Sequence, residues 1–148
     1  MNQQTVNVGP KVPWHLWAVG VTALLWNSIG AFDYAMTESR NAAYLAPFNA
    51  EQLAYFLALP KWVVATWATG VWGGVLGSLL LLLRQTRAVP VFAVSLCGMA
   101  ITFVHNYALS DGIRIMGGGA VVFSTVIFTV GVALLLYARF MAQAQVLR

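Results

Sequence analysis

Residues 62–83 read WVVATWATGVWGGVLGSLLLLL, an uncharged run between Lys61 and Arg84. A helix needs about 20 mostly apolar residues to cross the ~30 Å hydrocarbon core of a bilayer. This run has the length and the composition for one such crossing. It therefore predicts a membrane-spanning helix, and it decides the class of fold.

Three further apolar stretches of similar length lie around the first, at residues 14–36, 88–109 and 119–140. Across the whole sequence 60% of the residues are hydrophobic and 8% are charged, whereas soluble domains carry about 25% charged residues. The core of a 148-residue soluble domain is too small to bury so much apolar surface. We therefore expect residues 1–148 to form a single all-α membrane domain with four transmembrane helices.

Charged residues distinguish the two ends of the expected spans. One set of ends carries cations alone, namely Lys11, Arg84, Arg87, Arg139 and Arg148. The opposite set carries every acid in the chain, within the group Asp33, Glu38, Arg40, Glu51, Lys61, Asp111 and Arg114. Short loops rich in Lys and Arg stay in the cytoplasm. The sequence thus predicts a bacterial inner-membrane protein with cytoplasmic N- and C-termini, whose acids lie toward the periplasm.

The only long connection between expected spans is the loop 37–60. Within it Asn49 fits an N-cap, and Gln52, three residues later, completes a capping-box pattern. We expect residues 50–59 to form a short periplasmic amphipathic helix that Pro60 ends. It either lies on the membrane surface or packs as a lid over the bundle. The three glycines at 117–119 are expected to form a flexible turn before the fourth span.

The end of the first span resembles the end of the third. Residues 31–38, AFDYAMTE, align with residues 104–111, VHNYALSD, so that Asp33 matches Asn106. Both copies start on the same side of the membrane, which predicts two parallel-repeat hairpins related by an axis near the membrane normal. Chance similarity is the alternative, because apolar helices use a small set of residue types.

Polar side chains inside a bilayer are expensive, so each is a candidate for function. At 1.5 Å per residue, Asp33 lies roughly 29 Å from Trp14, near the outer boundary, where an acid can also simply reach water. Asn27 lies about 20 Å from the same residue, at a depth where an amide commonly bonds to a neighbouring helix. Trp26 beside it offers an aromatic surface.

His105 and Asn106 lie in the outer third of the third span, at a depth similar to Asp33. A histidine paired with an acid there would permit proton exchange with the periplasm, and a neutral histidine bonded to a carbonyl or hydroxyl is the alternative. His15 lies at the opposite side of the bilayer, so the two histidines cannot share one haem or metal ion. We expect no metal site, no cofactor and no catalytic residue, since no nucleophile lies beside a base.

The positive charge of the chain does not indicate a nucleic-acid partner. Its eight cations are scattered singly, with no basic patch. The pairs Gly70/Gly74 and Gly73/Gly77 in the second span are small-xxx-small patterns, which let helices approach closely. They predict close packing, either inside one chain or between copies.

Three segments carry a resemblance to a known family. They are residues 25–37, LWNSIGAFDYAMT, residues 71–78, VWGGVLGS, and residues 106–110, NYALS. With these segments nearly the whole chain resembles an uncharacterised proteobacterial family of small four-span membrane proteins, sometimes labelled sugar transporters. The part from Trp26-Asn27 to Asp33-Tyr34 is the most specific. The resemblance implies a four-span fold and a sugar-like solute, and it carries over no catalytic residue.

Together these patterns favour a protein that binds or transports a small polar, sugar-like solute between the first and third spans. The expected binding residues are Trp26, Asn27, Asp33, His105 and Asn106. Beyond the lipid bilayer, the expected partner is a second copy of the chain or another membrane protein. The alternatives are an accessory or assembly subunit of a larger inner-membrane complex and, less favoured, a membrane enzyme.

Overall fold

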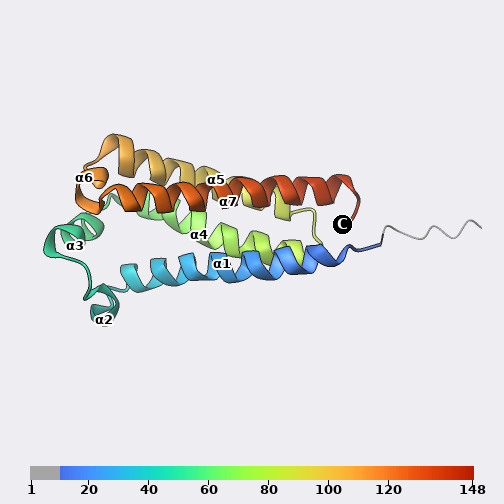
Figure 1. Cartoon of the computed structure of the whole chain (residues 1–148), viewed down its shortest axis with the longest axis horizontal. Helices are drawn as coiled ribbons and strands as arrows, with labels where there is room; N and C mark the ends of the chain where they lie inside the picture. Colours follow the sequence, from blue (N-terminus) through green and yellow to red (C-terminus); the bar gives the residue numbers. More distant parts are fainter. Residues whose placement is uncertain (1–10) are drawn as a thin grey trace, which may run out of the picture.

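The computed structural model describes residues 11–148, which form helices joined by turns. The long helices are α1 (Trp14–Glu38), α4 (Lys61–Leu82), α5 (Ala88–Val104) and α7 (Gly118–Gln143), as Figure 1 shows. With α5 counted together with the turn that extends it to Leu109, all four are long and apolar enough to cross a membrane. The four predicted spans are confirmed to within a few residues, and the chain is a multi-pass membrane protein.

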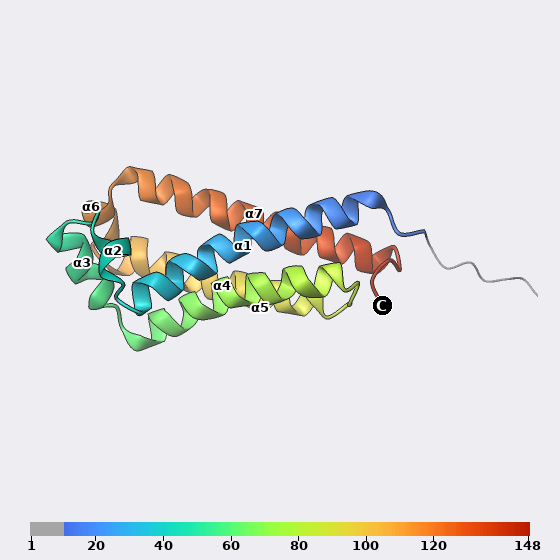
Figure 2. The same ribbon diagram turned by 90° about the horizontal axis from the view of Figure 1, so that it is seen from below.

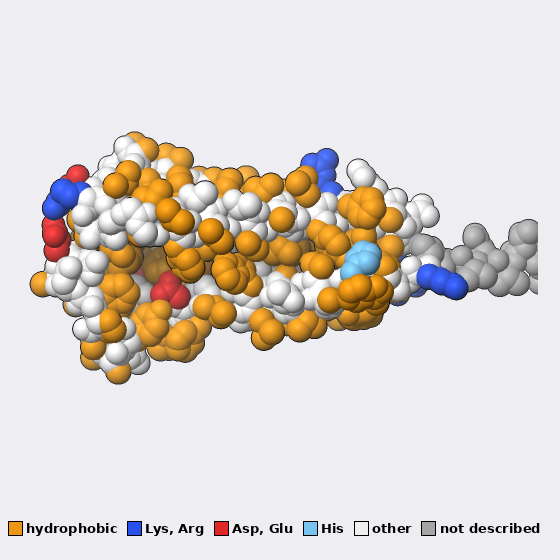
Figure 3. Space-filling view, viewed as in Figure 1, with side chains coloured by type: hydrophobic (Ala, Val, Ile, Leu, Met, Phe, Trp, Pro, Cys, Tyr) orange, Lys and Arg blue, Asp and Glu red, His pale blue; other side chains and the backbone are white. Residues whose placement is uncertain are grey.

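The short helices gather at one end of the bundle, which we call the loop end (Figure 1). They are α2 (Ala42–Leu45), α3 (Ala50–Leu57) and α6 (Gly112–Met116). Trp14 and the C-terminus lie at the opposite end, the terminal end. Figure 3 shows hydrophobic side chains over the middle of one face and charged side chains toward its two ends. This distribution suits a molecule whose middle lies in hydrocarbon.

The predicted capping box is present at the start of α3, where Asn49 and Gln52 each accept a hydrogen bond from the backbone N–H of the other. The helix ends at Leu57 and not at residue 59, because the residue before Pro60 is disfavoured in the helical region. α3 packs against α6 at the end of the bundle. The sequence did not predict α2 or α6, which are each about one turn long.

The expectation of a flexible turn at 117–119 is wrong for two of its three glycines. Gly118 and Gly119 form the first residues of α7. Only Gly117 leaves the helix, with a φ of 79° that favours glycine. One residue with positive φ is enough to separate α6 from α7.

The spans pack in the order α1, α4, α5 and α7, so that α4 lies between α1 and α5. Buried glycines of α4 make this packing close. A Cβ on Gly70 would lie 2.8 Å from Met99 of α5, and Gly74 faces Asn27 of α1. The small-xxx-small pairs therefore serve packing inside one chain.

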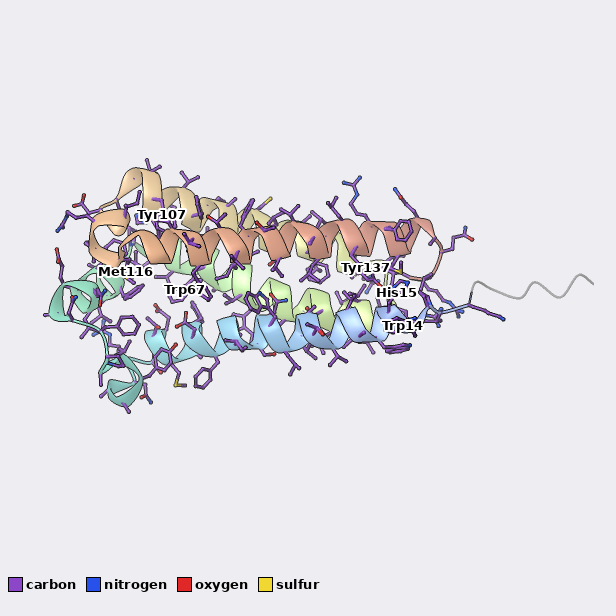
Figure 4. All side chains as sticks on the ribbon, viewed as in Figure 1. Trp14, His15, Trp67, Tyr107, Met116 and Tyr137 are labelled. Atoms are coloured by element: carbon purple, nitrogen blue, oxygen red, sulfur yellow. The ribbon has the colours of Figure 1, made fainter. Side chains whose placement is uncertain are left out.

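A cluster of buried apolar side chains lies in the terminal half of the spans. It is formed by Leu16, Ala23, Leu81, Ala88, Phe92, Leu134, Ala138, Met141, Val146 and Leu147. At this end His15 Nδ1 and Tyr137 Oη are 2.6 Å apart and join α1 to α7 (Figure 4). Toward the loop end α1 and α7 diverge, as Figures 1 and 2 show. Figure 3 shows this face hollowed near the loop end, with an acidic side chain beside the hollow.

Candidate functional site

Asn27 lies in the interface between α1 and α4. Its Nδ2 donates to the carbonyl oxygen of Ala23 at 2.8 Å and to Ser78 Oγ at 3.2 Å. Ser78 is fully buried and donates to the carbonyl oxygen of Gly74 at 2.8 Å. The side-chain oxygen of Asn27 lies against Gly74, where any Cβ would collide with it. Asn27 therefore bridges two spans, as amides at this depth commonly do.

Asp33 lies near the loop end of α1 and accepts a hydrogen bond of 2.6 Å from Tyr44 Oη of α2. The ring of Phe32 lies edge-on to that of Tyr44, with centroids 5.8 Å apart. The hydrogen bond to Asp33 raises the pKa of Tyr44 to about 12, and burial and the charge of Asp33 act in the same direction. Tyr44 thus ties the loop 37–60 to the first span as long as it keeps its proton.

The third span widens after α5 into a π-turn, η1 (His105–Leu109). A single π-helical turn is rare in proteins, and here it ends the third span. The side chain of His105 is 9% exposed and lies edge-on to Trp62 of α4, with ring centroids 5.3 Å apart. Its Nδ1 is 3.1 Å from Asn106 Oδ1. The two consecutive polar side chains of the turn, His105 and Asn106, therefore lie within hydrogen-bonding distance of each other.

Asn106 is the centre of a hydrogen-bond group at the loop end. Its Oδ1 accepts from Tyr55 Oη of α3 at 3.2 Å, and its carbonyl oxygen accepts from Ser110 Oγ at 3.1 Å. Tyr55 Oη and Ser110 Oγ are themselves 2.8 Å apart. Gly112 of α6 lies directly against the Asn106 carbonyl oxygen, where a Cβ would collide. Asn106 thus joins α3 to the π-turn, and α6 packs closely against its backbone.

The five predicted residues do not form one hydrogen-bonded cluster within residues 11–148. His105 and Asn106 lie together, whereas Asp33 is bonded to α2 and Asn27 to α4. The reason is the packing order, because α4 lies between α1 and α5. Trp26 is half-buried on α1, next to Asn27 in the chain.

Two residues that sequence reasoning misses are the loop tyrosines, Tyr44 and Tyr55. Each donates to a predicted candidate, to Asp33 and to Asn106 respectively. A tyrosine in a loop whose placement is unknown has no assigned partner, so nothing in the sequence selects it. The one available signal is that Tyr55 lies on the helix that the capping box predicts.

The loop end also holds a pocket of about 290 Å³ between the end of α1, α3 and the start of α4. It is lined by Thr37, Glu38, Arg40, Phe56, Leu57, Leu59, Lys61 and Val64. Elsewhere at this end Arg114 of α6 pairs with Glu51 of α3 at 2.8 Å. The hydrogen bond that Arg114 donates to Glu51, together with the negative charge of Glu51, raises the pKa of Arg114.

Within residues 11–148, no three His, Cys, Asp or Glu side chains come close enough to hold a metal ion. Comparison of the chain with protein-family models, with curated proteins and with solved structures finds no match. The chemistry of the loop end therefore follows from its own residues. Asp33 and Asn106 supply acceptor oxygens, each bound by a tyrosine hydroxyl, and charged side chains line a pocket nearby.

Proposed function

We propose that this chain is a bacterial inner-membrane protein that binds or transports a small polar, sugar-like solute at the loop end. One observation carries the proposal. Asp33 and Asn106, on two different spans, each accept a hydrogen bond from a tyrosine hydroxyl of the loop that joins the first two spans. A sugar hydroxyl is the same kind of donor and acceptor as a tyrosine hydroxyl, so it can replace either tyrosine.

The proposed solute contacts are His105 and Asn106, and Asp33 is a second, separate polar contact point on the other side of α4. Because His105 is mostly buried, the solute reaches this group from the side of the loop. Asn27 acts indirectly by holding α1 against α4, and Trp26 beside it forms part of the wall. The loop 37–60 closes the site when its tyrosines are bonded.

The proposed orientation has the loop end in the periplasm and both termini in the cytoplasm. The terminal end supports it, because its charged residues are Lys11, Arg84, Arg87, Arg139 and Arg148, and cations favour cytoplasmic loops. The acids belong to the segments at the loop end. A reporter that fluoresces only in the cytoplasm, fused to Arg148, tests this orientation directly.

The internal duplication and the family membership are part of the same proposal. Asp33 and Asn106 hold matching positions in the segments 31–38 and 104–111, and each accepts a hydrogen bond from a tyrosine hydroxyl. In parallel-repeat carriers, binding residues lie at such equivalent positions. The resemblance to the proteobacterial four-span family points to the same sugar-like class of solute.

Native mass spectrometry of the protein, extracted gently from its own membrane, tests the proposal. We expect a homo-oligomer that retains a small polar molecule. The double variant Asp33→Ala/Asn106→Ala should retain none. Thr125→Ala is the matched control, because its hydroxyl bonds only to the carbonyl oxygen of Val121 in its own helix. A retained molecule that is unchanged in the double variant contradicts the proposed site.

A second candidate function is that of an accessory subunit in a larger membrane complex. One feature of α7 favours it. This helix is the most apolar of the four spans, yet little of it is buried within the chain. The same mass spectrum separates the two functions, because an accessory subunit would be released in a fixed ratio with a foreign protein.

A further inference from the structure

Three charged side chains at the loop end line the same pocket. The charged side chains there are Asp33, Glu38, Arg40, Glu51, Lys61, Asp111 and Arg114. Glu51 and Asp111 lie 2.8 and 3.9 Å from Arg114, and Asp33 is bonded to Tyr44. The remaining three make no ion pair within residues 11–148. All three, Glu38, Arg40 and Lys61, line the pocket between α1, α3 and α4.

The pocket combines these charges with an apolar wall. Glu38 ends α1, Arg40 lies in the turn that follows, and Lys61 begins α4. Phe56 and Leu57 of α3 contribute carbon surface. Its volume of about 290 Å³ is close to the lower limit of small-molecule pockets, which is about 300 Å³. A compact ligand therefore fits better than an extended one.

We propose that this pocket binds a zwitterion, a molecule with one anionic group and one ammonium group. The anionic group meets Arg40 and Lys61, since guanidinium and ammonium groups pair well with phosphate and carboxylate. The ammonium group meets the carboxylate of Glu38. Phe56 and Leu57 cover the carbon atoms between the two groups. The headgroup of a phospholipid and a free solute such as phosphoethanolamine share this chemistry.

The backbone at Arg40 allows its side chain to be removed without disturbing the turn. The N–H of Arg40 donates to the carbonyl oxygen of Thr37 at 3.0 Å, and that of Asn41 to Met36 at 3.1 Å. This is a Schellman ending of α1, and Arg40 occupies its left-handed position with a φ of 53°. Glycine suits this position best. Arg84 and Gln145 hold the same left-handed position after α4 and α7, and at any of these ends a glycine keeps the turn while removing the side chain.

The zwitterion pocket is independent of the proposed solute site. None of its lining residues takes part in the hydrogen bonds of Asp33 or Asn106. Arg40→Gly, which touches neither of these hydrogen bonds, should therefore retain the solute of the proposed site as the native protein does. Loss of zwitterion binding and loss of solute binding can therefore be told apart.

The test uses the full chain and two probes. The first is free phosphoethanolamine, titrated calorimetrically into the detergent-solubilised protein. The second is a nanodisc with equal amounts of phosphatidylethanolamine and phosphatidylglycerol, from which native mass spectrometry identifies retained lipid. Arg40→Gly should weaken binding about tenfold, as expected for the loss of one charge-assisted contact, without lowering the melting temperature. Glu38→Gln should remove the preference for the ammonium headgroup over glycerol.

Arg114→Gln is the control, because Arg114 is a cation of the same end that does not line the pocket. Binding of free phosphoethanolamine supports the proposal with a solute as ligand. Retention of phosphatidylethanolamine alone supports it with a lipid as ligand. The proposal is overturned if neither probe binds with preference, or if Arg40→Gly binds as tightly as the native protein.

Discussion

At the residue scale, a polar side chain in a span of this protein is not by itself a sign of function. The hydroxyls of Thr69, Thr102, Thr125 and Thr129 all donate to carbonyl oxygens four residues earlier in their own helices. Such bonds satisfy a hydroxyl where hydrocarbon offers no partner. Asp33 and Asn106 differ, because they bond to tyrosines that lie outside the spans.

Gly98 provides a sharp test of packing at this scale. A Cβ there would lie 2.7 Å from the carbonyl oxygen of Thr66 and 3.0 Å from the backbone nitrogen of Gly70. Because backbone atoms cannot rotate away, Gly98→Ala should force α4 and α5 apart and destabilise the protein by about 1–3 kcal/mol. Gly119→Ala is the control, because nothing lies within 4 Å of a Cβ at that position. Equal unfolding free energies of the two variants in detergent would contradict the close approach.

Tyr44 predicts a dependence on alkaline pH. Its pKa in the folded protein is raised from 10.0 to about 12, chiefly by the hydrogen bond to Asp33. The unfolded chain therefore loses this proton first, so the stabilisation by Tyr44 is complete below pH 10 and is lost as the pH rises to about 12. Titration of tyrosinate absorbance should show a late component that Tyr44→Phe removes and Asp33→Asn moves toward lower pH. A late component that persists in Tyr44→Phe would assign it to another tyrosine.

At the scale of elements, the loop end is held together by side chains and not by a continuous apolar core. α3 has no fully buried residue. Tyr55 connects it to the π-turn, and the pair Glu51–Arg114 connects it to α6. Exposed ion pairs contribute little to stability, so Tyr55 is the main attachment of α3.

We therefore expect Tyr55→Phe to release α3 without unfolding the spans. The variant loses the bonds from Tyr55 Oη to Asn106 Oδ1 and Ser110 Oγ, at 3.2 and 2.8 Å. Amide hydrogen exchange should rise several-fold in α3 and stay unchanged in α1.

Tyr107→Phe is the matched control for this experiment. Tyr107 Oη bonds to Ala120 and Ser124 of α7, so its loss should loosen the start of α7 and leave α3 protected. Increased exchange of α3 in both variants would mean that the loop end opens as one unit.

At the scale of the whole molecule, α1 and α7 meet at the terminal end and diverge toward the loop end. The 2.6 Å hydrogen bond between His15 and Tyr137 connects the first and last spans at the terminal end. A double-mutant cycle of His15→Ala and Tyr137→Phe should give a coupling of about 0.5–1.5 kcal/mol in unfolding free energy. Additive effects of the two changes would mean that α1 and α7 are held together by apolar packing alone.

Local sequence patterns were sufficient to predict the helices but not the hydrogen-bond partners at the candidate site. The uncharged run at 62–83 predicts α4 to within one residue, and Asn49 with Gln52 predicts the start of α3. Both signals depend on residues that are neighbours in the chain. The partners of Asp33 and Asn106 lie 11 and 51 residues away, and no periodicity connects them to Tyr44 and Tyr55.

The sequence by itself determined that the chain has four membrane-spanning helices and where they begin and end, because the thickness of the bilayer sets the length of an apolar run. Only the tertiary structure decided which polar groups meet. The order of the spans places α4 between α1 and α5, which separates Asp33 from His105 and Asn106. It also brings the end of α1 beside the start of α4, where Glu38, Arg40 and Lys61 surround one pocket. Such juxtapositions depend on how close glycines let the helices approach, and that is a property of packed surfaces in three dimensions.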